Sequence, residues 1–274
     1  MTYKEVLKRY KIELQSHRGQ KTFVEGTSGC TNWEKRINTV KASPDNKLIP
    51  KHEFSGQIID DYLYLHNGIK IEKASYYGYA MLKMLMDNNG VHEPEEEKAF
   101  GEVLKHIKDG STMIELGAYW SHYSMWFNQT IKDAKNIMVE PTKSNLEFGK
   151  KNFEINNMTG SFYHNKIGAG KNSITVDKLF ELENIDRLAI CHSDIQGHEG
   201  EMLKGAKKNL SKIDYFFIST HGDAIHNQCL KFLKNNNFII LCSSNKKQSY
   251  SWDGLIVARN PEVDGPDKID IAKR

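Results

Sequence analysis

Apolar residues recur at regular intervals from about residue 95 onward. The stretch 95–107 predicts a helix, because its apolar residues fall on one helical face and a following Asp-Gly pair supplies a stop. These apolar residues are Phe100, Val103, Leu104 and Ile107. The short apolar run 113–117 ends in glycine and predicts a strand directly after this helix.

Strand-like and helix-like segments alternate through the rest of the chain. Further strands are expected at 137–141, 161–164, 187–191 and 215–219, and helices at 144–156, 198–210 and 228–233. Strands separated by helical patterns predict a mostly parallel sheet with helices on both faces. The last two apolar runs, 238–242 and 255–258, are joined by a polar loop without room for a long helix, so an antiparallel hairpin is expected there.

Three segments of the chain differ in their patterning. Residues 1–90 have helix candidates at 5–14 and 76–86, and we expect a helical cap that acts as a lid or as an oligomerisation element of a homo-oligomer. Residues 91–260 carry the alternating pattern and form the main domain. Residues 261–274 are a polar tail.

Composition narrows the classes of partner. The chain has 274 residues, 39% of them hydrophobic, which is enough for a substantial core. Its 38 basic and 35 acidic residues nearly cancel, so neither a nucleic acid nor an anionic membrane is expected as a partner. The absence of a long apolar stretch and the charged N-terminus predict a cytoplasmic protein without a membrane span. The four cysteines are scattered and are expected to be reduced thiols.

The segment 115–121, with the sequence ELGAYWS, is the first candidate for ligand binding. It follows a predicted strand and opens a helix, which is where open α/β sheets bind ligands. Gly117 lets the backbone approach a ligand closely, and Glu140 at the next strand end is placed to accept hydrogen bonds from ribose hydroxyls. The glycine-rich pattern that binds dinucleotide phosphates is missing. A nucleoside cofactor without phosphates, S-adenosylmethionine, fits the segment better.

Several motifs resemble those of FkbM-type methyltransferases, over roughly residues 92 to 222. They occur in the order of that family: IELGA at 114–118, VEP at 139–141 with Asn145, DIQGHE at 194–199 and LKGA at 203–206. The resemblance implies a Rossmann-like class I methyltransferase fold, with a mostly parallel sheet and a C-terminal antiparallel hairpin. It also implies S-adenosylmethionine as methyl donor and O-methylation of a hydroxyl on a sugar, glycan or other polyhydroxylated small molecule.

The resemblance and the residue pattern together give a set of expected cofactor contacts. These are Glu115, Gly117, Ala118, Tyr119, Ser121, Glu140, Asn145 and Asp194. The chain departs from the family pattern at four positions. Tyr119 and Ser121 stand where the family usually has Asn and Gly, His192 stands where Lys is common, and Ser219 stands where an acid is frequent. The cofactor loop must therefore bend without its second glycine.

A second candidate site lies where the strand 187–191 is expected to end. His192 and Asp194 are two residues apart, so they share one face of a strand, and His198 and Glu199 begin the next helix. His221, at the end of the following strand, is expected at the same edge of the sheet. His198, Asp194 and His192 are the candidate catalytic residues, with His198 as the base. Asp194, Glu199 and His221 are candidate ligands for a divalent cation, Mg²⁺ or Mn²⁺ first.

Other interpretations of the same residues stay open. Glu199 also suits a helix cap, and His192 also suits a hydrogen-bonded strand end. Tyr123 and Trp120 either pack in the core or stack on a sugar. At the level of function, a metal-dependent hydrolase built on the histidine and carboxylate cluster, or a catalytically silent binding module of the same fold, are the alternatives to a methyltransferase.

Overall fold

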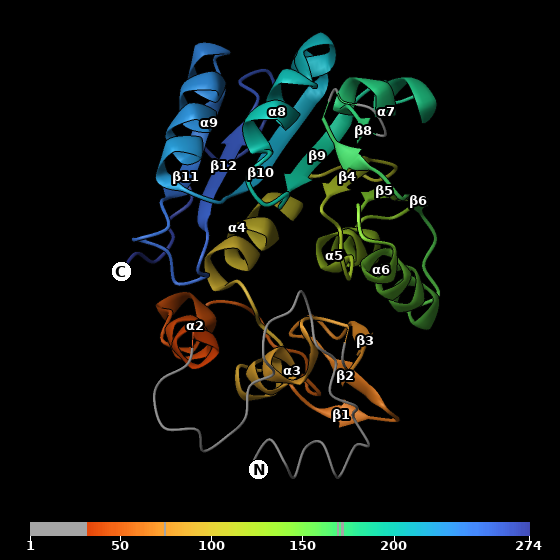
Figure 1. Ribbon diagram of the computed structural model, residues 1–274, viewed down its shortest axis with the longest axis vertical. Helices are drawn as coiled ribbons and strands as arrows, with labels where there is room; N and C mark the ends of the chain where they lie inside the picture. The colour runs from red at the N-terminus through yellow and green to blue at the C-terminus, as the bar shows by residue number, and fades with distance from the viewer. Residues whose placement is uncertain (1–31, 74, 169, 171–172) are drawn as a thin grey trace.

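The computed structural model describes residues 32–73, 75–168, 170 and 173–274. Figure 1 shows the chain as two stacked parts. The smaller part is the N-terminal extension up to α3, drawn in red to orange. The larger part is built around a seven-stranded sheet and runs from α4 to the C-terminus, with α4 lying between the two parts.

The central sheet has the strand order β11-β12-β10-β9-β4-β5-β6. Six of its strands run in one direction, and β12 alone is antiparallel to both of its neighbours, β10 and β11. The strands are β4 (Thr112–Leu116), β5 (Lys135–Val139), β6 (Ser161–Tyr163), β9 (Leu188–Ser193), β10 (Ile213–Thr220), β11 (Ile239–Ser244) and β12 (Gly254–Arg259). The expected parallel sheet with an antiparallel C-terminal hairpin is therefore confirmed, and β4 lies at the point where the strand order reverses.

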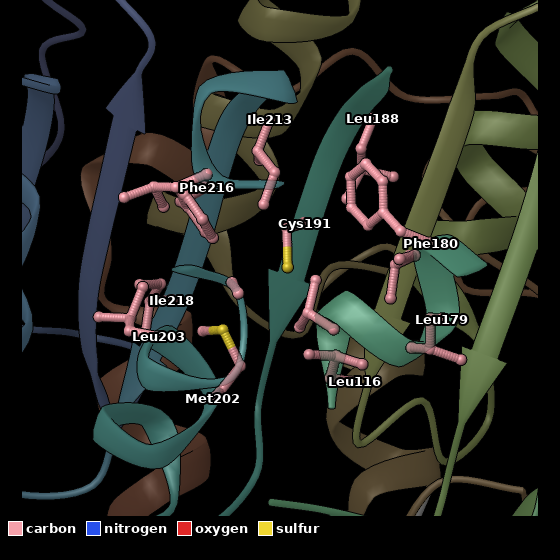
Figure 2. Close-up of a cluster of buried hydrophobic side chains, with 14 of the residues drawn as sticks. Leu116, Leu179, Phe180, Leu188, Cys191, Met202, Leu203, Ile213, Phe216 and Ile218 are labelled. Carbon is pink, nitrogen blue, oxygen red and sulfur yellow. The ribbon is translucent and has the colours of Figure 1, made fainter. Parts of the chain in front are cut away.

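Helices cover both faces of this sheet. The helices α7 (Val176–Leu182), α8 (Glu199–Lys204) and α9 (Asp223–Asn235) bury their apolar residues on one face. Figure 2 shows the centre of this layer, where Phe216 and Ile218 of β10 and Cys191 of β9 meet side chains such as Met202 and Leu203. On the other face lie α4 (Pro94–Leu104), α5 (His122–Thr130) and α6 (Lys143–Ile155).

The N-terminal extension is less helical than its sequence pattern predicts. It contains α2 (Asn32–Lys41), a short 3₁₀ helix η1 (Pro44–Lys47) and α3 (Gly78–Asp87). Between them lies a three-stranded antiparallel sheet that was not predicted: β1 (Ile58–Ile59), β2 (Tyr62–Tyr64) and β3 (Lys70–Glu72). Its strands have two or three residues, too few to show an alternating pattern. The helix expected at 76–86 is confirmed as α3, and the one expected at 5–14 lies outside the described residues.

The extension shares a hydrophobic core with the loop and helix that follow β4 in the main domain. Leu63, Ile71 and Leu82 pack in one cluster with Trp120 and Met125 of the loop and helix that follow β4. The extension therefore covers the edge of the sheet at which β4 and its parallel neighbours end.

Other elements differ from expectation in detail. The helix expected at 198–210 breaks after Lys204 and continues as a 3₁₀ helix, η2 (Lys207–Lys212). Helix α7 and a two-stranded pair, β7 (Lys166–Ile167) with β8 (Ser173–Ile174), had no predicted counterpart. The polar tail has no regular structure, but Ile269 is buried, and the backbone amide of Ala272 donates to Asp45 of η1.

Cys191, Cys229 and Cys242 are buried free thiols, as expected, and Cys30 lies outside the described residues. Within the described part of the chain, every helix is too short or too polar to span a bilayer.

Candidate active site

The end of β4 fixes the closest approach between two backbones in the site. Gly117 has φ = +76°, and a Cβ atom added to it would lie 1.9 Å from the carbonyl oxygen of Asp194. The amide of Gly117 donates to Val139 of β5, while the amide of Asp194 donates to Leu116 of β4. Only glycine fits this position, because any side chain would force β4 and β9 apart.

The loop that follows bends without a second glycine. Tyr119 and Ser121 both have left-handed backbone conformations, with φ of +43° and +63°. Ser121 is completely buried, and its Oγ has no hydrogen-bond partner among the described residues. A Cβ atom at Gly149 of α6 would lie 2.4 Å from this Oγ, so glycine is needed on the facing helix as well. The departure at Ser121 is thus accommodated at the cost of backbone strain.

Glu140 follows β5 and is buried. Its Oε2 accepts the amide of Tyr119 at 3.3 Å, and its Oε1 accepts the amide of Thr142 at 2.8 Å and the side-chain Nδ2 of Asn145 at 3.4 Å. Glu115, the other strand-end acid, accepts the amide of Ser124 in α5 at 2.9 Å, and burial raises the pKa of its carboxyl.

These residues line a pocket at the carboxyl edge of the sheet. Four carboxylates face it, and most of the remaining wall is aromatic. The lining residues are Tyr76, Tyr77, His92, Glu93, Glu115, Gly117, Ala118, Tyr119, Trp120, His122, Tyr123, Glu140, Asn145, His192, Asp194 and Gln196. Seven of the eight expected cofactor contacts are among them. The eighth, Ser121, is buried in the loop and does not line the pocket.

The pocket is small. Its free volume is about 50 Å³, whereas ligand pockets commonly have about 300–1,000 Å³. Tyr76 stacks on Trp120 with ring centroids 4.7 Å apart, and Tyr77 meets Tyr119 edge-on at 5.2 Å. Both of these covering tyrosines come from the segment that enters α3. A larger hollow of about 950 Å³ lies at the opposite edge of the sheet, where ligands of such folds do not bind.

Asp194 lies in the pocket wall just after β9 and is linked to the end of β10. Its Oδ1 accepts Nε2 of Gln196 at 2.9 Å and lies 3.3 Å from Nε2 of His221. Nδ1 of His221 lies 2.8 Å from Oε1 of Glu199, the first residue of α8. The three predicted metal ligands are therefore in contact with one another. The carboxylates of Asp194 and Glu199 face opposite nitrogens of the His221 imidazole ring.

The environment shifts the pKa values of Asp194 and His221. Burial raises the pKa of the Asp194 carboxyl to about 6, although the nearby His221 opposes the rise. Burial of His221 disfavours its charged form, but the hydrogen bond to Glu199 and the charge of Asp194 outweigh it and raise the pKa of the imidazole to about 9. At neutral pH Asp194 and Glu199 are therefore carboxylates, and His221 is an imidazolium between them.

His192 lies inside the pocket wall with a partner that the sequence did not suggest. Its Nε2 lies 2.9 Å from Oε1 of Glu96 in α4, and its ring packs against Tyr123 with centroids 4.2 Å apart. Oε2 of Glu96 accepts the hydroxyl of Ser219 in β10 at 2.7 Å. Glu96 thus brings a carboxylate to the strand position where FkbM-type methyltransferases frequently have an acid and this chain has Ser219.

The structure does not bring every predicted residue to the pocket. His198 is exposed at the start of α8 and is not among the lining residues, so the expected convergence of His198 with Asp194 on one site is not observed. Conversely, Tyr76, Tyr77, His92 and Glu93 line the pocket although no motif indicated them. The acid-rich start of α4 resembles an ordinary solvated helix end in the sequence, and only the packing of the extension shows that it is buried.

The chain has a distant likeness to several solved structures. The chain is similar to M. capricolum TrmK in complex with S-adenosyl-homocysteine, at 15% identity and a TM-score of 0.40, covering 60% of this chain and 69% of that one. It is also similar to a precorrin-6y C5,15-methyltransferase from Geobacter metallireducens, at 11% identity and a TM-score of 0.45, covering 62% and 90%. A ribosomal protein L11 methylase from Lactobacillus delbrueckii matches at 11% identity with a TM-score of 0.43, covering 60% and 78%.

No curated protein matches the chain. The Methyltransferase FkbM domain matches residues 93–240, which is more than half of the chain and includes β4, β5, β9 and β10 with the pocket at their ends. The chain therefore belongs to the FkbM family of methyltransferases, and S-adenosylmethionine is the methyl donor that this membership implies.

Proposed function

We propose that the protein is an S-adenosylmethionine-dependent O-methyltransferase that acts on a hydroxyl of a sugar, glycan or other polyhydroxylated small molecule. The observation that carries the proposal is the partly buried Asp194 carboxylate in the pocket wall, held by His221 and Gln196 beside the cofactor loop. Such a group accepts a proton from a hydroxyl more readily than solvent does.

The pocket has the chemistry that this cofactor requires. S-adenosylmethionine supplies an activated methyl group on a positively charged sulfur. Glu140, buried at the end of β5, would accept hydrogen bonds from ribose hydroxyls, and Gly117 allows the close approach of β4 to the backbone at Asp194 beside it. Asn145 has a buried Oδ1 without a partner among the described residues. The acidic and aromatic wall favours a cationic ligand over a phosphorylated one.

Asp194 is the base in this proposal. Because its pKa is about 6, the carboxylate is ionised at neutral pH yet basic enough to take part in proton transfer. The acceptor oxygen forms a bond to the methyl carbon, the carbon–sulfur bond breaks, and the hydroxyl proton passes to Asp194. His221, protonated between Asp194 and Glu199, keeps the carboxylate oriented. The exposed position of His198 favours Asp194 over His198 for this role.

Assistance by a divalent cation at Asp194, Glu199 and His221 is the second form of the proposal. In the described arrangement the two carboxylates lie at opposite edges of the His221 ring, so one ion cannot contact a ring nitrogen and both carboxylates unless the ring turns. A metal ion that the wild-type chain binds and His221→Gln does not, together with loss of methyl transfer in that variant while S-adenosylhomocysteine still binds, would favour the ion over the proton-accepting Asp194.

The covering tyrosines suggest how ligands enter. We infer that Tyr76 and Tyr77 act as a lid, because the free space below them is far smaller than a nucleoside. Tyr76 is anchored by the guanidinium of Arg36 in α2, whose Nη2 donates to the phenol oxygen at 3.3 Å. Opening therefore involves the junction between the extension and the main domain.

The acceptor class is tested by incubating the full chain with labelled S-adenosylmethionine and a panel of sugars, polyols and amines. Transfer to a hydroxyl is expected, with kcat/KM rising through a pKa near 6 as Asp194 ionises. Asp194→Asn should lower kcat by about 10²-fold or more while S-adenosylhomocysteine still binds. Asp223, exposed in the first turn of α9 and outside the pocket, supplies the control Asp223→Asn. Transfer to amines alone, or an unchanged rate in Asp194→Asn, would contradict the proposal.

A further inference from the structure

A second cluster of histidines and a carboxylate is buried behind the pocket. His66 comes from the loop between β2 and β3 of the extension, Glu97 from the first turn of α4, and His122 from the first turn of α5. Their side chains are 2%, 0% and 1% exposed. One ring nitrogen of each histidine and a carboxylate oxygen of Glu97 all lie within 4.8 Å of one another.

The nitrogens and oxygens of this cluster are close together without being hydrogen-bonded. Nε2 of His66 lies 3.1 Å from Oε2 of Glu97, yet neither atom has a hydrogen-bond partner among the described residues. Both ring nitrogens of His122 are also unpartnered, and its Nε2 lies 3.8 Å from Oε1 of Glu97. A buried polar atom without a partner is costly, and this cluster has four.

Close but unbonded contacts are expected where donor atoms point at a common centre. Around a tetrahedral ion with bonds of about 2.0–2.1 Å, neighbouring ligand atoms lie about 3.3–3.4 Å apart. The 3.1 Å between Nε2 of His66 and Oε2 of Glu97 is close to this value, and the ligand atoms of all three residues lie within 4.8 Å of one another. Two imidazoles and one carboxylate form a donor set that suits Zn²⁺ and divalent iron, manganese or cobalt better than Ca²⁺ or Mg²⁺.

The surroundings also resemble those of a metal centre. Oε1 of Glu97 accepts the backbone amides of His92 and Glu93 at 2.8 and 3.1 Å, which leaves Oε2 directed at the cluster. His92 lies between the Glu97 and Glu93 carboxylates. Hydrogen bonds to a ligating carboxylate hold it in place, as the two amides do for Glu97.

Aromatic rings enclose the cluster. The ring of His122 stacks on Trp120 at 5.0 Å, and His66 packs against Trp126 at 4.6 Å. Such a wall suits an ion that carries at most one small additional ligand, such as the water that completes a tetrahedral site with three protein ligands.

We propose that His66, Glu97 and His122 bind one divalent transition-metal ion, with Zn²⁺ as the first choice. The ion crosslinks three segments: the extension, the start of α4 and the start of α5. Since His122 also lines the pocket, the ion fixes the helix that follows the cofactor loop. This ion is distinct from the candidate ion at Asp194, Glu199 and His221. Its role is to tether the extension to the main domain, and it does not contact the acceptor.

The test uses the full chain, stripped with a chelator and then dialysed against Zn²⁺ or Co²⁺. Elemental analysis should find one ion per chain, the Co²⁺ form should show the visible absorption of a tetrahedral site, and added Zn²⁺ should raise the melting temperature. His66→Gln and Glu97→Gln should each lose about 10²-fold or more in metal affinity. His106→Gln is the matched control, because His106 is exposed just beyond the end of α4.

His221→Gln distinguishes the two candidate sites and should keep the ion. Absence of stoichiometric metal in the folded wild-type chain would overturn the proposal. So would metal binding that survives His66→Gln, or that is lost in His221→Gln alone. The titration of the wild-type chain decides the question even where a variant fails to fold.

Discussion

Alanine substitutions at Gly117 and Gly110 distinguish the effect of backbone strain from the effect of close packing at the cofactor site. Gly117 and Gly110 have nearly equal positive φ angles, +76° and +74°. A Cβ atom at Gly110 meets nothing within 4 Å, whereas one at Gly117 would lie 1.9 Å from the carbonyl oxygen of Asp194. Either alanine substitution therefore adds a similar backbone strain, but only Gly117→Ala also creates a steric overlap.

The expected magnitudes follow from these distances. A left-handed alanine costs about 1–2 kcal/mol, and the smaller entropy of its unfolded chain offsets about 0.4–1 kcal/mol of that. Gly110→Ala should thus lower the free energy of unfolding by about 1 kcal/mol. Gly117→Ala must also push β4 and β9 apart by about 1 Å, which adds about 1–3 kcal/mol of overpacking and weakens the bond from Asp194 to Leu116.

Urea unfolding of both variants measures the difference, and calorimetry with S-adenosylhomocysteine measures its effect on the site. Gly117→Ala should be less stable than Gly110→Ala by at least about 2 kcal/mol and should bind the ligand more weakly, while Gly110→Ala binds it like the wild type. Equal stability losses, or undiminished binding by Gly117→Ala, would refute the close approach between β4 and the residue after β9.

Three further predictions concern single side chains. Ser121→Gly should stabilise the protein by about 1 kcal/mol in urea unfolding, because it removes a left-handed side chain and an unpaired buried hydroxyl; destabilisation would contradict this. Glu140→Gln should lower the affinity for S-adenosylhomocysteine by about 10- to 100-fold in calorimetry through loss of charge-assisted hydrogen bonds. His221, whose folded pKa of about 9 lies above its ordinary value of 6.5, stabilises the fold fully below pH 6.5. That contribution, at most about 3 kcal/mol, should be lost between pH 6.5 and 9, and the loss should disappear in His221→Gln.

The fold of the main domain was predictable because its sequence signals are local. The apolar runs that became β4 and β5 are flanked by glycine, proline and helical patterns, so the sheet and its antiparallel hairpin follow from periodicity. Gly117 and Glu140 were predictable for a similar reason, since the end of a parallel strand at the switch point of the sheet is a ligand site. The short strands of the extension gave no such signal.

The rest of the site depends on contacts distant in sequence. Glu96 approaches Ser219, 123 residues away, and thereby supplies a carboxylate that the strand itself lacks. His66 meets Glu97 only because the extension folds over the end of the sheet. His198, by contrast, looked well placed from its neighbours in sequence, but the turn before α8 leaves it on the surface. Sequence reasoning located the strand ends and missed the partners that packing brings to them.

The measurement that tests the central claim most directly is calorimetric titration of the full chain with S-adenosylhomocysteine. A methyltransferase with its cofactor pocket at the ends of β4 and β5 should bind one molecule per chain, compete with S-adenosylmethionine for it, and lose affinity in Glu140→Gln. Folded protein that shows no binding at millimolar ligand, or binding that Glu140→Gln leaves unchanged, would contradict the account.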